Sequence, residues 1–347
     1  MSKLIFIGPV NLNNIPSTGD TMKNQLFLDR FKEVFDKIYV VDTYFWKTSP
    51  SVFIKLLWYI LVHRSAKIVL SASPLSSHSL IKMLYLLHVP NDIFYWVVGG
   101  SFHKMVESGQ LDVNVYRSLK GIFVQGHTMV DTLTKAGLSN VLYVANSKLI
   151  THYGKKIGKK DGKTHFVFLS RVEEYKGCSD IITSADQLIR KGYQDKFDVS
   201  FYGRPSEDGA YANRFKEMVA TCPVTEYKGV LNLRNPQNYD ELASYDCMLF
   251  PTYWHGEGFP GIVIDAYISS LPIIASDWNL NKDVIEDGVT GWVIPAHDVN
   301  ALTERMEYVI NHPEEVVKME SVCKKRAALY DSREVLSEAN LKKIGLL

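Results

Sequence analysis

The sequence lacks the features that mark disulfide-rich, zinc-stabilised or membrane-spanning proteins. Its four cysteines, at 178, 222, 247 and 323, are widely spaced and include no CxxC pair, so we expect reduced cysteines in a cytoplasmic protein. The longest apolar run, VFIKLLWYILV at 52–62, contains Lys55 and is shorter than the ~20 residues of a spanning helix. The apolar run in MSKLIFIGPV is too short for a signal peptide and predicts a first buried strand.

Net charge is also small, at +1, but the charges are unevenly distributed. Residues 1–160 hold 19 Lys and Arg against 9 Asp and Glu, whereas residues 161–347 hold 20 against 29. A basic half is typical of proteins with an anionic partner, such as a phosphorylated lipid, a membrane surface or nucleic acid, and solubility alone is the alternative.

What the sequence does contain is a repeated α/β rhythm. With 347 residues, 46% of them apolar and 22% charged, the chain is expected to form two globular domains. Short apolar runs alternate with segments of helical period, and this predicts βα units on parallel sheets. The runs are KLIFIG, KIYVVD, KIVLSAS, DIFYWVVGG, GIFVQG, VLYVAN, HFVFLS, FDVSFYG, CMLFPT and PIIAS.

The stretch GKKIGKKDGK at 154–163 has the composition of a linker. We therefore expect an α/β protein with two doubly wound, Rossmann-like domains, 1–158 and 159–347, that face a central cleft. This division leaves open whether the last helix packs on the first domain.

The segment PTYWHGEGFPGIVIDAYISS at 251–270 carries two acids around a predicted helix start. Glu257 lies in the loop and Asp265 lies one to two turns into the helix. Gly258 and Gly261 leave room for a ligand, and the free amides of residues 261–263 would face a phosphate. Carboxylates accept hydrogen bonds from hydroxyl groups, so the pattern predicts a phosphorylated sugar. A solvated loop acid and an exposed helix charge are the alternatives.

A second segment, FLSRVEEYKG at 168–177, places Arg171 and Lys176 in a turn between a strand and a helix. Two cations beside a helix N-terminus suit a diphosphate, whereas a surface position is the alternative for each cation alone.

The EGF loop, the second acid eight positions later and the following SSLPIIASD resemble glycosyltransferase family 4, retaining enzymes of GT-B fold. The resemblance implies that Glu257 contacts the donor sugar and Asp265 the ribose of the nucleotide. It implies that Arg171 and Lys176 neutralise the diphosphate in place of a metal, and the sequence has no Asp-x-Asp pair. Two departures are Asp265, where the family has Glu, and EGFPG, where many members have EGFG.

The same resemblance implies further site residues, for which ordinary strand, turn and surface positions are the alternatives. His103, after DIFYWVVGG, would stand near the reacting carbon and join Glu257, Arg171 and Lys176 as a catalytic residue. The donor-binding residues would be Gly19, Gly203, Gly229, Val230, Gly258, Phe259, Gly261, Ile262, Val263 and Asp265.

The function implied is that of a metal-independent, retaining hexosyltransferase without a cofactor. Its partners would be a nucleotide-diphosphate sugar and a saccharide or lipid-linked acceptor in surface polysaccharide or glycoconjugate synthesis, with no nucleic acid. A nucleotide-sugar epimerase of GT-B fold and a non-catalytic partner subunit are the alternatives. The apolar segments 52–62 and 78–89 could rest on the inner face of the cell membrane, although core packing is the alternative for both.

Overall fold

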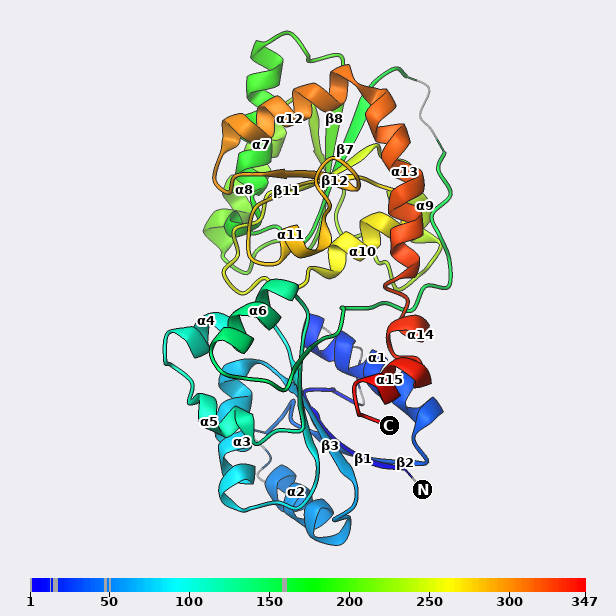
Figure 1. The fold of residues 1–347 in the computed structure, drawn as a ribbon. Coiled ribbons are helices and arrows are strands. Elements are labelled where there is room, and N and C mark those ends of the chain that lie inside the picture. The colour runs from blue at the N-terminus through cyan, green and yellow to red at the C-terminus, as the bar shows by residue number, and fades with distance from the viewer. Residues whose placement is uncertain (1, 13, 15–17, 47–48, 50, 158–160) are drawn as a thin grey trace. The chain divides into compact units, whose positions relative to one another are not determined.

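The computed structural model describes residues 2–12, 14, 18–46, 49, 51–157 and 161–347. The chain divides into two compact units (Figure 1). Unit 1 contains residues 1–149 and 331–347, and unit 2 contains residues 150–330. The predicted boundary between residues 158 and 159 falls at residues 158–160, outside the described residues.

Unit 1 is built on a parallel six-stranded sheet with the strand order β2-β1-β3-β4-β5-β6. Its strands are β1 (Lys3–Gly8), β2 (Lys37–Asp42), β3 (Lys67–Ala72), β4 (Ile93–Val97), β5 (Gly121–Val124) and β6 (Val141–Tyr143). The helices are α1 (Gly19–Val34), α2 (Ser51–Val62), α3 (Pro74–Leu86), α4 (Phe102–Glu107), α5 (Val113–Arg117), α6 (His127–Lys135), α14 (Ser332–Val335) and α15 (Glu338–Lys343).

One core of unit 1 joins the two ends of the chain. Phe27 and Phe31 of α1 pack against Trp96 of β4, with ring centroids 4.3 and 6.2 Å away. The same cluster contains Leu336, Leu341 and Leu346 of the carboxyl-terminal segment, all fully buried. The segment 331–347 is therefore part of the core of unit 1.

Unit 2 repeats the architecture with the strand order β12-β11-β10-β7-β8-β9, again all parallel. Its strands are β7 (Thr164–Leu169), β8 (Phe197–Tyr202), β9 (Thr225–Tyr227), β10 (Cys247–Phe250), β11 (Ile273–Ser276) and β12 (Gly291–Ile294). The helical elements are the short 3-10 turn η1 (Glu174–Lys176), α7 (Cys178–Arg190), α8 (Gly209–Thr221), α9 (Asn238–Leu242), α10 (Gly261–Ile268), α11 (Asn281–Val284), α12 (Val299–Asn311) and α13 (Pro313–Ala328).

The predicted α/β fold is confirmed, because both sheets are parallel and doubly wound. The stretch 154–163 was expected to be a linker, but its first residues make contacts within unit 2. Gly154 donates its N–H to the Ile268 carbonyl at 3.0 Å, and the Lys156 ammonium lies 2.7 Å from Glu320. This first part therefore packs on unit 2.

Candidate functional site

Two of the predicted motifs meet at the point where the chain order in the sheet of unit 2 reverses. Strands β8 and β9 lie on one side of β7, and β10, β11 and β12 lie on the other. In open α/β sheets, ligands bind beyond the carboxyl ends of the strands at such a point. The segments that leave β7 and β10 carry Arg171, Lys176 and Glu257. The topology thus gathers residues that are about 80 positions apart in sequence.

The two segments are in contact at Gly177, the residue after Lys176. Gly177 has a φ of +79°, and a Cβ at this position would lie 2.5 Å from the carbonyl oxygen of Pro251. Tyr253 also donates its N–H to the Tyr175 carbonyl at 2.9 Å. Glycine therefore satisfies both the left-handed backbone and the close approach, and it holds Lys176 against the loop that contains Glu257.

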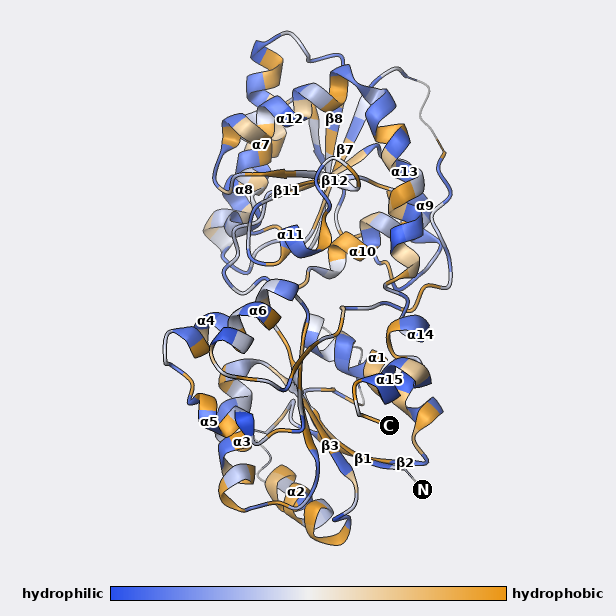
Figure 2. Ribbon diagram, in the orientation of Figure 1, coloured by the Kyte–Doolittle hydropathy of each residue, from blue (hydrophilic) through white to orange (hydrophobic). Residues whose placement is uncertain are grey.

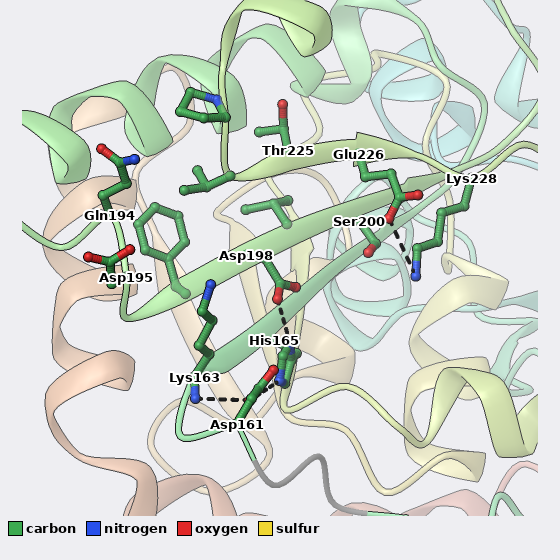
Figure 3. Close-up of a pocket in the computed structure, with 14 residues that line it drawn as sticks. Asp161, Lys163, His165, Gln194, Asp195, Asp198, Ser200, Thr225, Glu226 and Lys228 are labelled. Carbon is green, nitrogen blue, oxygen red and sulfur yellow. Dashed lines mark hydrogen bonds and ion pairs between the residues drawn. The ribbon is translucent and has the colours of Figure 1, made fainter.

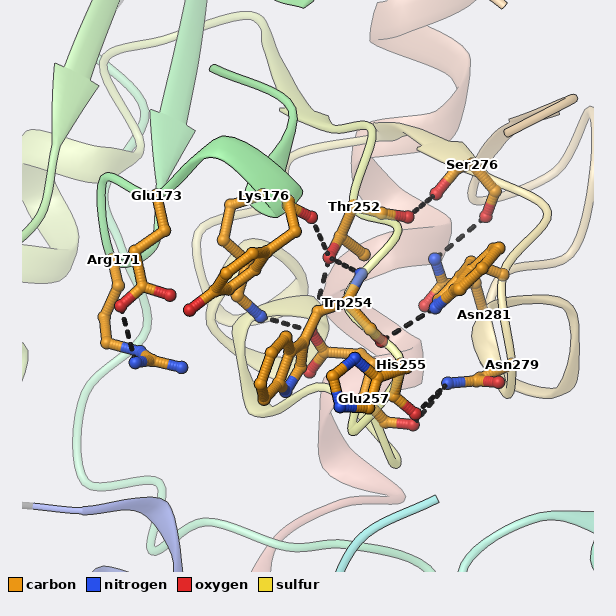
Figure 4. Close-up of polar contacts among 12 residues, drawn as sticks. Arg171, Glu173, Lys176, Thr252, Trp254, His255, Glu257, Ser276, Asn279 and Asn281 are labelled. Atoms are coloured by element: carbon orange, nitrogen blue, oxygen red, sulfur yellow. Dashed lines mark hydrogen bonds and ion pairs between the residues drawn. The ribbon is translucent and has the colours of Figure 1, made fainter. Parts of the chain in front are cut away.

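Lys176 and Glu257 form an ion pair in which the ammonium donates to Oε2 of the carboxylate (Figure 4). The side chains are only 7% and 14% exposed. Because burying an unpaired charge is costly, each of these groups makes the burial of the other possible. The pair presents one cation and one carboxylate at the same place, which suits a ligand with both phosphate and hydroxyl groups.

Arg171 forms a second pair, with Glu173, at an Nη1 to Oε1 distance of 2.6 Å (Figure 4). The Arg171 side chain is 55% exposed, whereas the Glu173 side chain is 10% exposed. The other carboxylate oxygen of Glu173 is buried without a hydrogen-bond partner in the described structure. The sequence interpretation missed Glu173, although residues i and i+2 of an extended segment share one face.

The loop with Glu257 is held by the segment that follows β11, which was also not anticipated. Trp278 donates its indole N–H to the Trp254 carbonyl at 2.7 Å, and the Asn279 amide donates to the Glu257 carbonyl at 3.0 Å. The Trp254 ring stacks on Tyr175 with centroids 4.4 Å apart. Burial raises the pKa of Tyr175, and the neighbouring Glu173 raises it further. The segment SDWNLN gave no sequence signal for this role.

Asp265 lies in α10 and is only 5% exposed. The Tyr239 hydroxyl donates to its Oδ1 at 2.6 Å. Burial and then the Asp265 carboxylate raise the pKa of Tyr239, so this hydroxyl stays protonated and remains a donor. The carboxylate predicted to contact ribose therefore already holds one hydrogen bond within unit 2.

The helix α10 begins after Pro260, close to the predicted position, but one of the three expected free amides has a partner. Val263 donates its N–H to the Pro260 carbonyl at 3.1 Å, and the Val263 side chain is fully buried. The prediction of a free amide at Val263 is wrong, because the first turn after Pro260 closes on itself. Gly261 and Ile262 are partly exposed at the start of the helix.

The remaining donor-binding predictions in unit 2 fall into exposed and buried positions. Gly229 has a φ of +79°, and nothing lies within 4 Å of the place that a Cβ would take there. Val230 is 58% exposed, and Gly258 is partly exposed. Phe259 is buried, with its ring 5.3 Å from that of Tyr330, so it packs inside unit 2.

Gly203, directly after β8, is hydrogen-bonded through both its N–H and its carbonyl group. It donates its N–H to the Gly229 carbonyl at 2.8 Å and accepts from the Tyr227 hydroxyl at 2.8 Å. These bonds join the turns after β8 and β9. The predicted donor-binding residues Gly203 and Gly229 are therefore hydrogen-bonded to each other.

Two predicted residues belong to unit 1. Gly19 is the first residue of α1, and nothing lies within 4 Å of a Cβ at this position. His103 lies in α4 and is 7% exposed. Their predicted roles toward the donor and the reacting carbon remain predictions.

A separate hollow of about 450 Å³ lies beside the amino-terminal parts of β7, β8 and β9 (Figure 3). In it, the His165 ring contacts Asp198 through Nδ1 at 2.7 Å and Asp161 through Nε2 at 3.0 Å. Among the described residues these three are the group close enough to hold a metal ion. Each carboxylate faces a different ring nitrogen, so the contacts are those of a hydrogen-bonded histidine, away from the carboxyl ends where Arg171 and Glu257 lie.

Comparison with known proteins gives a family match over unit 2. The family model for glycosyl transferases group 1 matches residues 150–328. The capsular polysaccharide biosynthesis glycosyltransferase CapM of Staphylococcus aureus is 26% identical over 171 residues, which are 48% of this chain and 41% of CapM. The D-inositol 3-phosphate glycosyltransferase of Nocardia farcinica is 23% identical over 145 residues, which are 41% of this chain and 32% of that protein. The chain thus matches less than half of the length of these two relatives.

Solved structures with the same fold cover the whole chain. Anabaena HepE in complex with UDP aligns with a TM-score of 0.75 at 12% identity and covers 99% of this chain and 100% of its own. Sucrose-phosphate synthase from Thermosynechococcus elongatus aligns with a TM-score of 0.73 at 12% identity and covers 100% and 99%. The fold is GT-B, and the chain belongs to the family of glycosyl transferases group 1.

Proposed function

We propose that this protein is a metal-independent, retaining glycosyltransferase of family 4 that moves a sugar from a nucleotide-diphosphate donor to an acceptor hydroxyl. The observation that carries the proposal is the buried Lys176–Glu257 pair beyond the carboxyl ends of β7 and β10, with Arg171 on the same segment as Lys176. Unit 2 binds the donor, and unit 1 supplies the acceptor site. The acceptor is a saccharide or a lipid-linked sugar in the cytoplasmic steps of surface polysaccharide synthesis.

In the proposed reaction these residues stabilise the leaving diphosphate and bind a sugar hydroxyl. When the donor bond breaks, negative charge grows on the leaving diphosphate, and Arg171 and Lys176 stabilise that charge. Lys176 then exchanges its Glu257 partner for a phosphate oxygen, and Glu257 becomes free to accept a hydrogen bond from a sugar hydroxyl. The acceptor attacks from the face that the diphosphate leaves, and a donor phosphate oxygen takes its proton.

The test begins with binding and continues with turnover. A panel of UDP- and GDP-sugars is screened for a rise in melting temperature, because a ligand that binds the native state stabilises it by mass action. The donor found is then incubated with and without saccharide acceptors, in the presence of EDTA, and the anomeric configuration of the product is determined by NMR.

The outcomes separate the possible functions. Acceptor-dependent transfer with retained configuration, insensitive to EDTA, supports the proposal. Conversion of the nucleotide sugar without any acceptor identifies an epimerase. Failure of every nucleotide sugar to bind favours a non-catalytic partner subunit, and inversion at the anomeric carbon contradicts the retaining mechanism.

A further inference from the structure

The helix α2 of unit 1 exposes a wide apolar face. Of its twelve residues only Leu56 and Ile60 are buried. The exposed large hydrophobic residues are adjacent pairs that repeat every four positions, and they cover about half of the helix circumference. They are Phe53, Ile54, Leu57, Trp58, Leu61 and Val62. Figure 2 shows α2 as mainly hydrophobic. We call these six residues the α2 face.

Further exposed apolar side chains stand at two neighbouring places. Trp46, which precedes α2, is 45% exposed, and its ring lies 6.3 Å from that of Phe53. At the end of α3, Leu86 and Leu87 are more than half exposed. The crossovers β2 to β3 and β3 to β4 run in the same direction across the sheet, and because such crossovers are right-handed, α2 and α3 cover the same face of the sheet. Monomeric proteins seldom leave so much apolar surface in water, so such a surface indicates a binding partner.

The charges around the α2 face indicate what the partner is. No Asp or Glu occurs between Asp42 and Asp92, whereas this interval holds five Lys and Arg. Of those that the structure describes, three are exposed: Lys55 within α2, Arg64 just after it and Lys82 on α3. An apolar face with tryptophans and a basic border is the pattern of helices that lie in the interface of an anionic bilayer.

A second copy of the chain fits this surface less well. A two-fold interface would bring the α2 face against itself, and the acid-free basic border would then oppose an identical basic border. The geometry also excludes insertion across the bilayer, because twelve helical residues span about 18 Å, against about 30 Å of hydrocarbon. No helix among the described residues is long and apolar enough to cross a membrane.

We propose that the α2 face is a docking surface for an anionic phospholipid bilayer. The apolar side chains enter the boundary between headgroups and acyl chains, and Lys55, Arg64 and Lys82 contact lipid phosphates. This inference rests on surface residues of unit 1 and stands independently of the transferase reaction proposed for unit 2. It makes the protein a peripheral one that binds the membrane by a face of one helix.

The test uses co-sedimentation of the full chain with phosphatidylcholine vesicles that either lack or contain about a third of phosphatidylglycerol. The first variant combines Ile54→Ser, Trp58→Ser and Leu61→Ser. The matched control combines Ile157→Ser, Val317→Ser and Leu329→Ser, which remove equally exposed apolar side chains elsewhere: 68%, 64% and 58%, against 72%, 63% and 65% on α2. Circular dichroism and melting curves establish that each variant is folded.

We expect the wild type and the control to bind the anionic vesicles and to release them as salt is raised, because the lipid phosphates are screened. The α2 variant should lose at least tenfold in partitioning, by the area of apolar surface removed. A second variant, Lys55→Gln with Arg64→Gln and Lys82→Gln, should weaken binding more than tenfold to anionic vesicles alone. The proposal is overturned by absence of vesicle binding, by equal loss in the control, or by a dimer of the wild type that the α2 variant dissociates.

Discussion

The buried pair Lys176–Glu257 has a structural role and a proposed chemical role, and substitutions can separate them. Lys176→Met leaves Glu257, which is only 14% exposed, without its cation, and we expect a loss of about 3 kcal/mol in the free energy of unfolding. The double variant Lys176→Met with Glu257→Gln removes both charges and should recover most of that stability. Urea unfolding measures both.

Transferase activity should not follow stability in this series. The single and the double variant both lack the cation for the leaving diphosphate, so turnover should fall by about 100- to 1000-fold in each. Activity restored together with stability in the double variant would show that Lys176 serves the fold alone.

Arg171 is held by a carboxylate that competes with any anionic ligand. Glu173→Gln keeps the shape of the side chain and removes its charge, so Arg171 becomes available to a phosphate. We expect UDP, the leaving group of one class of donor in the screen proposed above, to bind several-fold more tightly to this variant in isothermal titration calorimetry, because its phosphates no longer compete with the Glu173 carboxylate for Arg171. Uridine, which has no phosphate, is the control ligand and should be unaffected. An equal gain for both ligands would contradict the role given to Glu173.

At the scale of elements, the turns after β8 and β9 offer a matched pair of glycines. A Cβ on Gly203 would lie 1.6 Å from the Ser170 carbonyl oxygen, whereas one on Gly229 would meet nothing within 4 Å. Gly203→Ala must displace the end of β7 or β8 and should cost at least ~3 kcal/mol. Gly229→Ala meets only the cost of its positive φ, about 1 kcal/mol.

Urea unfolding of the two glycine variants measures this difference. Equal losses would mean that the ends of β7 and β8 can separate easily. Since the site stands on these strand ends, we also expect Gly203→Ala to weaken nucleotide binding.

The elements that the sequence predicted well are those with strong apolar runs. β1 and β2 begin and end as expected from KLIFIG and KIYVVD. The three-residue β9 and the strand β12 were not predicted, because short runs beside turns carry too little periodicity to separate strand from loop. The candidate site shows the same division. The sequence placed the motif residues Arg171, Lys176 and Glu257 in the segments after β7 and β10, where the structure has them, and their roles stay predictions. The contacts of Glu173 and Asn279 with these residues form only in the folded unit and were not predicted from the sequence.

At the scale of the whole molecule, the carboxyl-terminal segment is required for unit 1. Leu341 is fully buried in the core of unit 1, so Leu341→Ala should cost about 2–5 kcal/mol. Leu329, at the end of α13, is 58% exposed, and Leu329→Ala should change stability by less than about 0.5 kcal/mol.

The readout must report on unit 1 separately, since two units need not unfold together. Hydrogen exchange followed by mass spectrometry meets this need. Leu341→Ala should increase exchange in β1 and α1 and leave β7 and α7 unchanged. Increased exchange confined to unit 2 would contradict the assignment of the segment.

The shared core of α1 and the segment 331–347 also orders events on the ribosome. All residues of unit 2 are synthesised before Leu336, Leu341 and Leu346, which complete the core of unit 1. During translation, the core of unit 1 therefore stays incomplete until residues 331–347 are made, although most of unit 1 is synthesised first. Unit 2 has all of its residues by then.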